Sequence, residues 1–501
     1  MSELYEMLKP HLDKTYALNV ALTMLSFDNS TAAPKNAIEN TSKAIGLLSG
    51  EHYNALINED VKRLLKELST EQEQAFLSFE EKAIVKKLNK EFKQTAAIPP
   101  EEFQAFQILL AKAYPIWESA KNKNDYASFA PTLEEIIRYS KKFASYNQEE
   151  DQKLYDVQLD DYEEGFNMEI LDGFFSKLRS ALVPLVHKVN EKENAIQTEF
   201  LSQDYEIDKQ KNFCRFLAEY IGFDFNRGVI AESEHPFTTE LHNHDVRITN
   251  HFQKSQPDFS IFSVIHESGH ALYEQGIDDA ITMTPIGQGT SMGMHESQSR
   301  FYENNLGRSL PFWTPIYSRL QELFPKQLET VSLEQFYRAV NHAHSSLIRT
   351  EADELTYPFH IMIRYEIEKL IFEGNIPASE LPAIWNQKYQ EYLGVCPTTD
   401  TEGILQDMHW ALGSFGYFPS YALGSAIAAQ IYHHLKTVMP LDTYLEEGNL
   451  KPIQAYLNEH IHRFGGAKNT QELLKDMTGE PFNPDYYISY LTDKYTALYD
   501  L

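Results

Sequence analysis

Apolar residues recur at intervals of three and four along almost the whole chain, and this periodicity is the strongest constraint on its fold. Such spacing places apolar side chains on one face of a helix. Breaks such as Ile98-Pro99-Pro100 and Gly374-Asn375-Ile376-Pro377 separate the periodic segments. The segments predicted to be helical are 72–95, 101–121, 132–145, 169–193, 258–276, 311–324, 333–347, 359–373 and 421–436. We therefore predict a mostly α protein.

The sequence contains one convincing extended region. Two short runs of β-prone residues, 237–241 and 246–249, lie about one turn apart, just before the helix predicted at 258–276. This arrangement is typical of a β-hairpin. We expect a hairpin or short sheet beside that helix.

Composition narrows the possible partners and compartments. The formal net charge is −29 and no Lys/Arg run offsets it, which argues against nucleic-acid or anionic-membrane partners. Two cysteines cannot form a disulfide framework in 501 residues. The first residues lack the layout of a signal peptide, and no stretch of about eighteen apolar residues occurs. We expect a cytoplasmic protein.

The segment His266-Glu267-Ser268-Gly269-His270 has the form His-Glu-x-x-His. On a helix, residues four apart share one face, so both imidazoles can bind one Zn²⁺ while Glu267 lies beside them as a candidate base. The alternative is an amphipathic helix with polar surface groups. Asp258 or Ser260 can cap the start of this helix and Gly276 its end. The pattern indicates metal-assisted hydrolysis.

A catalytic zinc site needs a third protein ligand and one open position. Glu296, in the segment His295-Glu296-Ser297-Gln298, opens another predicted helix and is the preferred ligand, with His295 as the alternative. The metzincin pattern, which requires a glycine and a third histidine after the motif, is absent because residues 273–275 are Tyr, Glu and Gln. His242 and His244 are more simply polar groups of the hairpin than ligands.

No linker, repeat or shift in composition divides the chain. The motifs between 235 and 421 have to converge on one metal, and the N-terminal helices have nothing else on which to pack. We expect one unit, 1–501, in which residues 1–150 form a helical cover over a groove and 151–501 form the catalytic region.

Further motifs give the chain a family resemblance. It resembles the carboxypeptidase Taq-type zinc metallopeptidases, a family of cytosolic carboxypeptidases, whose motifs occur here in the family's order. Besides the two segments described above, they are His235-Pro236-Phe237, Asp245-Val246-Arg247-Ile248-Thr249, Ile348-Arg349-Thr350-Glu351-Ala352-Asp353 and Gly403-Ile404-Leu405-Gln406-Asp407-Met408-His409-Trp410.

The resemblance implies a helical fold with a deep groove, similar to neurolysin and angiotensin-converting enzyme, and a homodimer. It assigns His266, His270 and Glu296 to one zinc ion per chain, for which Co²⁺ can substitute, and Glu267 to the role of base. The implied reaction removes single amino acids of broad type from the free C-terminus of peptides.

A carboxypeptidase has to hold a free carboxylate, and a guanidinium suits that task. Arg349 and Arg247 are the candidates, with structural salt bridges to Asp353 and Asp245 as the alternatives. Among the other motif residues, His235, Asp245 and Gln406 are assigned to substrate binding.

The tetrahedral intermediate needs hydrogen-bond donors for its oxyanion. By similarity to angiotensin-converting enzyme, we assign His409 to the substrate backbone and Tyr417 to the oxyanion. Tyr421 is the alternative to Tyr417 and a further substrate-binding candidate. A lone tyrosine is more often a core residue than a catalytic one.

Two other functions fit the same chain. An oligopeptidase or dipeptidyl carboxypeptidase would use the same zinc chemistry but release longer pieces. An inactive peptide-binding module would keep zinc only as a structural ion, although an intact Glu267 and an open fourth position argue against it.

Overall fold

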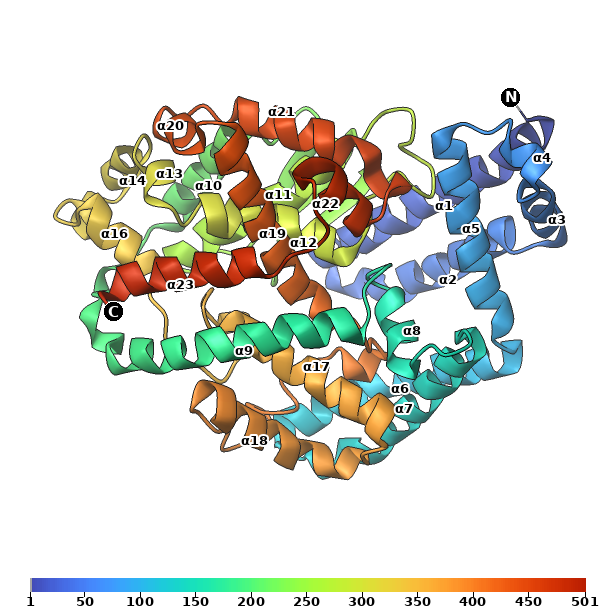
Figure 1. The fold of residues 1–501 in the computed structure, drawn as a ribbon, viewed down its shortest axis with the longest axis horizontal. Coiled ribbons are helices and arrows are strands. Elements are labelled where there is room, and N and C mark those ends of the chain that lie inside the picture. Colours follow the sequence, from blue (N-terminus) through green and yellow to red (C-terminus); the bar gives the residue numbers. More distant parts are fainter. Residues whose placement is uncertain (1) are drawn as a thin grey trace. The chain divides into compact units, whose positions relative to one another are not determined.

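The computed structural model describes residues 2–501 and shows a mostly helical protein with one small sheet (Figure 1). This confirms the predicted fold class. The chain forms two compact units. Unit 1 comprises the stretch ending at Lys93 together with Thr198–Tyr337 and Ile431–Pro481, and unit 2 comprises Gln94–Gln197, Arg338–Gln430 and Phe482–Leu501.

Unit 1 carries the sheet and the helices around it. Its helices are α1 (Glu3–Thr31), α2 (Ile38–Leu56), α3 (Glu59–Leu68), α4 (Glu71–Gln74), α10 (Ile207–Ile221), α11 (Pro257–Gln275), α12 (Met292–Arg300), α13 (Leu310–Trp313), α14 (Tyr317–Leu323), α15 (Pro325–Leu328), α20 (Leu441–Glu446), α21 (Lys451–His460) and α22 (Thr470–Thr478), with the 3-10 helices η1 (Lys35–Ala37), η3 (Glu199–Ser202) and η8 (His462–Ala467) and the π-helix η4 (Phe301–Leu306). The strands are β1 (Gly228–Glu232), β2 (Thr238–His242) and β3 (Asp245–Asn250).

Unit 2 contains helices and loops but no strand over the residues described. Its helices are α6 (Pro100–Lys123), α7 (Tyr126–Asn147), α8 (Leu154–Asp160), α9 (Met168–Glu191), α17 (Tyr357–Gly374), α18 (Leu381–Leu393) and α23 (Asp485–Tyr499), with the 3-10 helices η2 (Glu193–Ala195), η5 (Arg349–Glu351), η6 (Ala378–Glu380) and η7 (Trp410–Leu412). Three further helices, α5 (Phe79–Ala97), α16 (Leu333–Val340) and α19 (Phe418–Val438), contain points where the chain passes from one unit to the other.

The sheet has the strand order β1-β3-β2. Strands β2 and β3 form the predicted antiparallel hairpin, in which Thr238 pairs with Ile248. Strand β1, which we did not predict, runs parallel to β3 on its other side, with Gly228 opposite Val246. Both β2 and β3 pack against α11, so the sheet lies beside the helix that carries the His-Glu-x-x-His motif.

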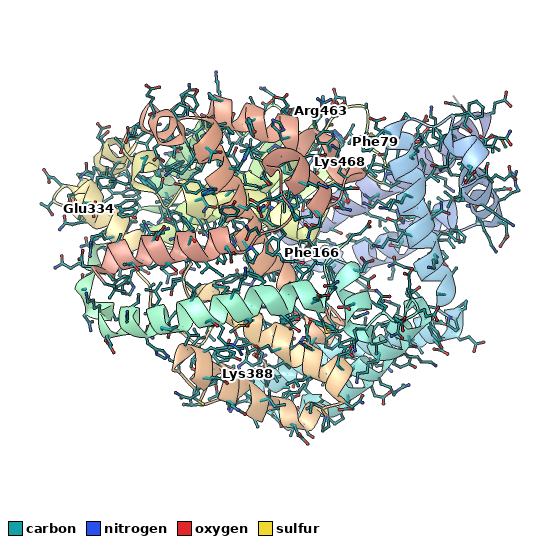
Figure 2. The ribbon with its side chains drawn as sticks, in the orientation of Figure 1. Phe79, Phe166, Glu334, Lys388, Arg463 and Lys468 are labelled. Atoms are coloured by element: carbon teal, nitrogen blue, oxygen red, sulfur yellow. The ribbon has the colours of Figure 1, made fainter. Side chains whose placement is uncertain are left out.

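Each unit has its own apolar packing. In unit 1, a cluster of buried side chains joins α1, α3 and α5 to the segment after α11 that holds Ile277, Ile281 and Ile286. In unit 2, α9 and α23 lie side by side (Figure 1). Phe166, labelled in Figure 2, packs edge-on against Phe482, so the residues leading into these two helices also meet.

Three predicted helices were wrong in extent. The 72–95 segment is divided between α4 and α5, and the 311–324 segment is broken between α13 and α14, where Pro315 lacks the N–H that a continuous helix needs. The 333–347 segment is helical only to Val340. Beyond it, the N–H groups of Ala343 and His344 donate to Tyr499 and Asp353. These tertiary hydrogen bonds replace those of a helix.

No helix within residues 2–501 combines the length and the apolar character needed to cross a bilayer. The predicted division into a cover and a catalytic region near residue 150, and the predicted groove, stay predictions.

Candidate metal centre

Helices α11 and α12 approach each other closely in unit 1, and a glycine makes this approach possible. A Cβ on Gly269 would lie 2.7 Å from Ser299 Cα and 2.8 Å from the carbonyl oxygen of Gln298. The glycine in the motif thus allows the backbone of α12 to pass directly over α11.

Helix α11 begins differently from our prediction. Pro257 occupies its first turn and Gln256 is the N-cap, so neither Asp258 nor Ser260 caps the helix as we expected.

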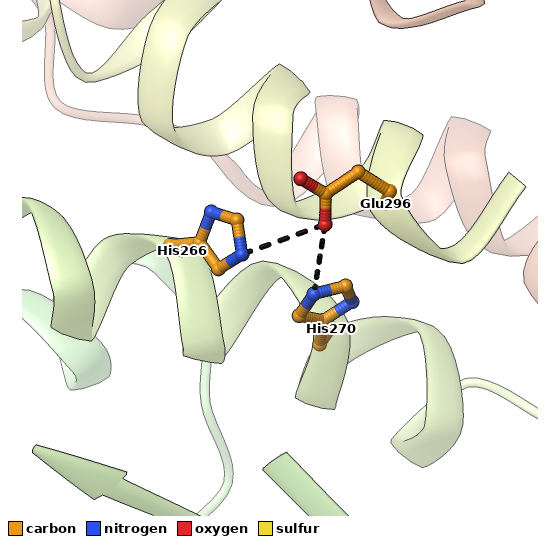
Figure 3. A group of neighbouring side chains, drawn as sticks. All are labelled: His266, His270 and Glu296. Carbon is orange, nitrogen blue, oxygen red and sulfur yellow. Dashed lines mark ion pairs between the residues drawn. The ribbon is translucent and has the colours of Figure 1, made fainter. Parts of the chain in front are cut away.

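The packing of α12 on α11 brings His266, His270 and Glu296 together (Figure 3). Glu296 Oε2 lies 3.6 Å from His266 Nε2 and 3.4 Å from His270 Nε2. Bonds of about 2.0–2.2 Å to a tetrahedral zinc ion place ligand atoms about 3.3–3.6 Å apart, so this donor set fits zinc. Burial lowers the pKa of His270 to about 3, which keeps the imidazole in the neutral form that binds a metal.

Glu267 follows the first of these histidines on α11 and is itself buried. Its Oε2 accepts a 2.6 Å hydrogen bond from Thr238 Oγ1 on β2. Burial raises the pKa of the Glu267 carboxyl above its ordinary value, as suits a group that has to accept and release a proton. The strand beside the motif therefore orients the candidate base.

Charged side chains surround two of the proposed ligands, His266 and Glu296. The Nδ1 of His266 lies 2.8 Å from Glu303 Oε2, and Arg300 donates to both Glu296 and Glu303, at 2.7 and 3.1 Å. Arg308 donates to the other oxygen of Glu303 at 3.2 Å. Burial opposes ionisation of Glu296 and Glu303, but the guanidinium of Arg300 holds the pKa of both carboxyls well below their usual range. Both therefore remain carboxylates, and Glu303 fixes the orientation of His266.

Unit 2 contains the arginine of the Ile-Arg motif in a buried ion cluster. Arg349 donates through Nε and Nη2 to Asp407 Oδ1, at 3.0 and 2.8 Å, and Arg364 pairs with Asp407 Oδ2 at 2.6 Å. Our expected alternative, a salt bridge from Arg349 to Asp353, was wrong. Asp353 instead accepts hydrogen bonds from Thr356 at the start of α17.

The aromatic candidates form a cluster in the same unit. His409 Nε2 lies 3.4 Å from the hydroxyl of Tyr421, and the ring of Tyr417 lies 5.5 Å from that of His409 and 5.2 Å from that of Tyr421. Burial lowers the pKa of His409 to about 4. The amide of Gln406 is engaged with backbone groups, and its Oε1 accepts from the N–H of Arg349. Gln406 thus holds the arginine's backbone in place.

The remaining candidates lie in unit 1. Arg247 forms a bidentate pair with Asp245, at 2.8 and 2.7 Å, which is the salt bridge that we considered as the alternative for this residue. Its guanidinium also lies over the ring of Phe27. His235 is exposed in the loop between β1 and β2.

Several supporting residues escaped the sequence analysis. Glu303 and Arg300 lie seven and four residues after Glu296, a helical spacing that could have suggested a common face. Asp407 lies inside a quoted motif, but nothing in the sequence identified its partners. Thr238 had no signal, because its contact with Glu267 depends on how the strand packs on α11.

Comparisons with known proteins find a metallopeptidase family and several carboxypeptidases. The model of the carboxypeptidase Taq (M32) metallopeptidase family matches residues 7–495. Carboxypeptidase 1 of Bacillus subtilis (strain 168) is 43% identical over 480 residues, which is 96% of this chain and 95% of that protein. Thermostable carboxypeptidase 1 of Pyrococcus furiosus is 36% identical and covers 96% of both chains. The crystal structure of an M32 carboxypeptidase from Deinococcus radiodurans R1 has a TM-score of 0.96 and 33% identity, covering 100% of each chain.

Proposed function

Because this chain belongs to the carboxypeptidase Taq (M32) metallopeptidase family and is a metallocarboxypeptidase, we propose that it uses zinc to release single amino acids of broad type from the free C-terminus of peptides. The observation that supports this most strongly is the convergence of His266, His270 and Glu296 at tetrahedral spacing, with Glu267 beside them.

In this proposal each side chain has a distinct task. A zinc ion bound by the three ligands would polarise the scissile carbonyl and lower the pKa of water. Glu267 accepts the proton of the attacking water and passes it to the leaving amine. The hydrogen bond from Thr238 keeps its carboxylate oriented during both transfers. His409 contacts the substrate backbone, and Tyr417 or Tyr421 donates to the oxyanion.

We assign the C-terminal carboxylate of the substrate to Arg349 rather than Arg247. Arg349 and Arg364 share the single carboxylate of Asp407, so this trio keeps one uncompensated positive charge. Arg247 and Asp245 form a neutral pair. An anionic chain end is therefore better stabilised at Arg349.

The family likeness leads us to propose three further properties: two chains form a homodimer, the enzyme acts in the cytoplasm, and Co²⁺ can replace zinc. Chromatography with light scattering tests the dimer. Metal reconstitution of the chelated protein tests the cobalt exchange.

Mass spectrometry of a mixed peptide library, incubated with and without a chelator, tests the proposed reaction. We expect ladders shortened by one residue at a time from the C-terminus, and none when the metal is removed. Release of dipeptides or internal fragments would favour a dipeptidyl carboxypeptidase or oligopeptidase instead. Equal cleavage in the presence of the chelator would contradict metal-assisted hydrolysis.

A further inference from the structure

The two histidines of the metal centre are supported in different ways. His266 Nδ1 meets a carboxylate directly, that of Glu303, at 2.8 Å. His270 Nδ1 meets another imidazole, since it lies 2.5 Å from His295 Nδ1. The opposite ring nitrogen of His295, Nε2, lies 2.7 Å from Glu274 Oε1. A chain of three side chains thus runs from His270 to Glu274.

Only one arrangement of protons satisfies this chain when His270 binds a metal. The Nε2 of His270 faces Glu296 and would bind the metal. Its Nδ1 therefore carries the hydrogen and donates a hydrogen bond to Nδ1 of His295. The Nδ1 of His295 must then accept, and its Nε2–H donates to Glu274. Each imidazole uses its one donor and its one acceptor, and the chain ends on a carboxylate.

The surroundings of His295 are shaped to hold it in this position. Glu274 is 2% exposed and also accepts a 2.9 Å hydrogen bond from the N–H of Gly289. A Cβ on Gly289 would lie 2.6 Å from the His295 ring, so glycine leaves the space that the ring fills. The ring of Tyr273 packs against it at 5.3 Å.

We propose that His295 and Glu274 are positioning residues for His270: they fix its tautomer and orientation for the metal, and His295 is not itself a ligand. This inference rests on the metal site proposed above. His295 lies next to Glu296 on α12, and Glu274 lies four residues after His270 on α11, so each helix supplies one positioning residue beside a ligand of its own. Partners of this kind change metal affinity about 10- to 100-fold when removed.

Matched substitutions separate this role from simple packing. His295→Leu removes the hydrogen-bond acceptor for His270. His295→Asn introduces a side chain of a size similar to leucine but keeps an oxygen near the position of Nδ1. We expect His295→Leu to weaken zinc binding about 10- to 100-fold and His295→Asn to recover most of that loss, as measured by competition with a chromophoric chelator. Likewise, Glu274→Gln, which keeps an oxygen acceptor, should bind zinc more tightly than Glu274→Leu.

His462 offers a control from the same neighbourhood. It is buried, packs on Tyr273 and lies 2.9 Å from Gln298 Oε1. Within residues 2–501, no hydrogen bond or ring contact joins it to His270. His462→Leu should keep zinc affinity near that of wild type. A loss equal to that of His295→Leu would show a packing effect and overturn the proposal.

Two further outcomes would also overturn it: wild-type affinity in His295→Leu, or no advantage of His295→Asn over His295→Leu. If instead the wild-type protein failed to bind zinc, the proposed function would fail, and the positioning role with it. Glu296→Ala serves as the reference for loss of a ligand and should bind zinc far more weakly than either His295 variant.

Discussion

Glu267 lies next to a proposed ligand in sequence, yet its carboxylate accepts a hydrogen bond from Thr238 instead of joining the cluster of donor atoms. We predict that Glu267→Gln keeps one zinc ion per chain but loses 10²- to 10⁴-fold in kcat, because the amide cannot accept the proton of the attacking water. Elemental analysis beside a kinetic assay measures both quantities. Loss of the metal, or turnover near the wild-type rate, would contradict the assigned role.

The uncompensated charge at Arg349 predicts how the enzyme treats amidated peptides. Amidation removes the anionic partner and leaves the net positive charge of the buried Arg349, Arg364 and Asp407 trio uncompensated, at a cost of about 2–5 kcal/mol. Amidated peptides should therefore be cleaved at least tens of times more slowly than free acids. The ratio of kcat/KM values for one matched peptide pair measures this discrimination.

Arginine variants identify the responsible residue. Arg349→Ala should reduce the discrimination between the free acid and the amide, whereas Arg247→Ala should keep it, because Arg247 is already neutralised by Asp245. The reverse result would move the carboxylate site to Arg247. Equal cleavage of both peptides by the wild-type enzyme would remove the basis for either assignment.

At the scale of single residues, the sequence predicts those site residues whose arrangement follows from their spacing along one helix. His266 and His270 converge because they lie four apart, and Glu296, the preferred third ligand at the start of the next predicted helix, joins them. The contacts of Thr238 and Asp407 could not be predicted, because each depends on the packing of segments far apart in the chain. The alternative considered for Arg349, a salt bridge to Asp353, named a sequence neighbour, whereas the observed partner is the distant Asp407.

The crossing of α11 and α12 depends on the absence of a side chain at Gly269. Gly269→Ala would push the methyl group against the backbone of α12, which cannot move as a flexible side chain can. We predict a destabilisation of about 1–3 kcal/mol and weaker zinc binding, since the ligands come from both helices. Chemical denaturation and chelator competition measure the two effects.

A glycine in open surroundings provides the control. Gly173 lies inside α9, and among the described residues no atom outside the local backbone of this helix lies within 4 Å of the position of its missing Cβ. Gly173→Ala should stabilise the protein by about 0.4–1 kcal/mol, because alanine is the better helix former. If both variants shifted stability alike, the close crossing would not be what requires glycine at 269.

Glu368 on α17 joins three segments of unit 2. It is fully buried and accepts hydrogen bonds from Tyr155 on α8, the indole of Trp410 and the N–H of Gly416, at 2.6, 2.7 and 2.8 Å. Trp410 and Gly416 are the sequence neighbours of His409 and Tyr417. The carboxylate therefore anchors the loop that presents both proposed catalytic side chains.

Burial raises the pKa of Glu368 from 4.5 to about 7, and this shift predicts a pH dependence of stability. Between these values the native state binds more protons than the unfolded state, so the contribution of this group falls as pH rises. Relative to wild type, Glu368→Gln should therefore gain about 2–3 kcal/mol in unfolding free energy from pH 5 to pH 8. Denaturation at both pH values measures the difference, and a constant difference would contradict the shift.

Helix existence was easier to predict from the sequence than helix extent. The periodic segments around α6, α7, α9 and α17 fall within the observed helices or within two residues of their ends. The apolar periodicity predicted too long a helix where distant side chains accept the backbone hydrogen bonds, as they do after Val340. It also missed β1, because five residues at the edge of a small sheet carry too little alternation to be recognised.

At the scale of the whole molecule, the proposed ligands lie in the stretch Thr198–Tyr337, and side chains that pack against this stretch come from other parts of the chain. Ile277, Ile281 and Ile286 pack on residues of α1, α3 and α5. We predict that a fragment of residues 198–337 does not fold, although it contains His266, His270 and Glu296. Circular dichroism and zinc titration would test this, and cooperative unfolding with stoichiometric zinc binding would contradict it.

Each compact unit is assembled from three separate stretches of chain, and this has a consequence for synthesis on the ribosome. The ligands and η4 are complete at residue 306, but unit 1 still lacks its third stretch, Ile431–Pro481. At about 5–20 residues per second, the ribosome needs roughly 9–35 s after residue 306 to complete that last stretch. During this interval the nascent chain carries all three proposed ligands while unit 1 is still incomplete. The finished metal site therefore forms only late in translation.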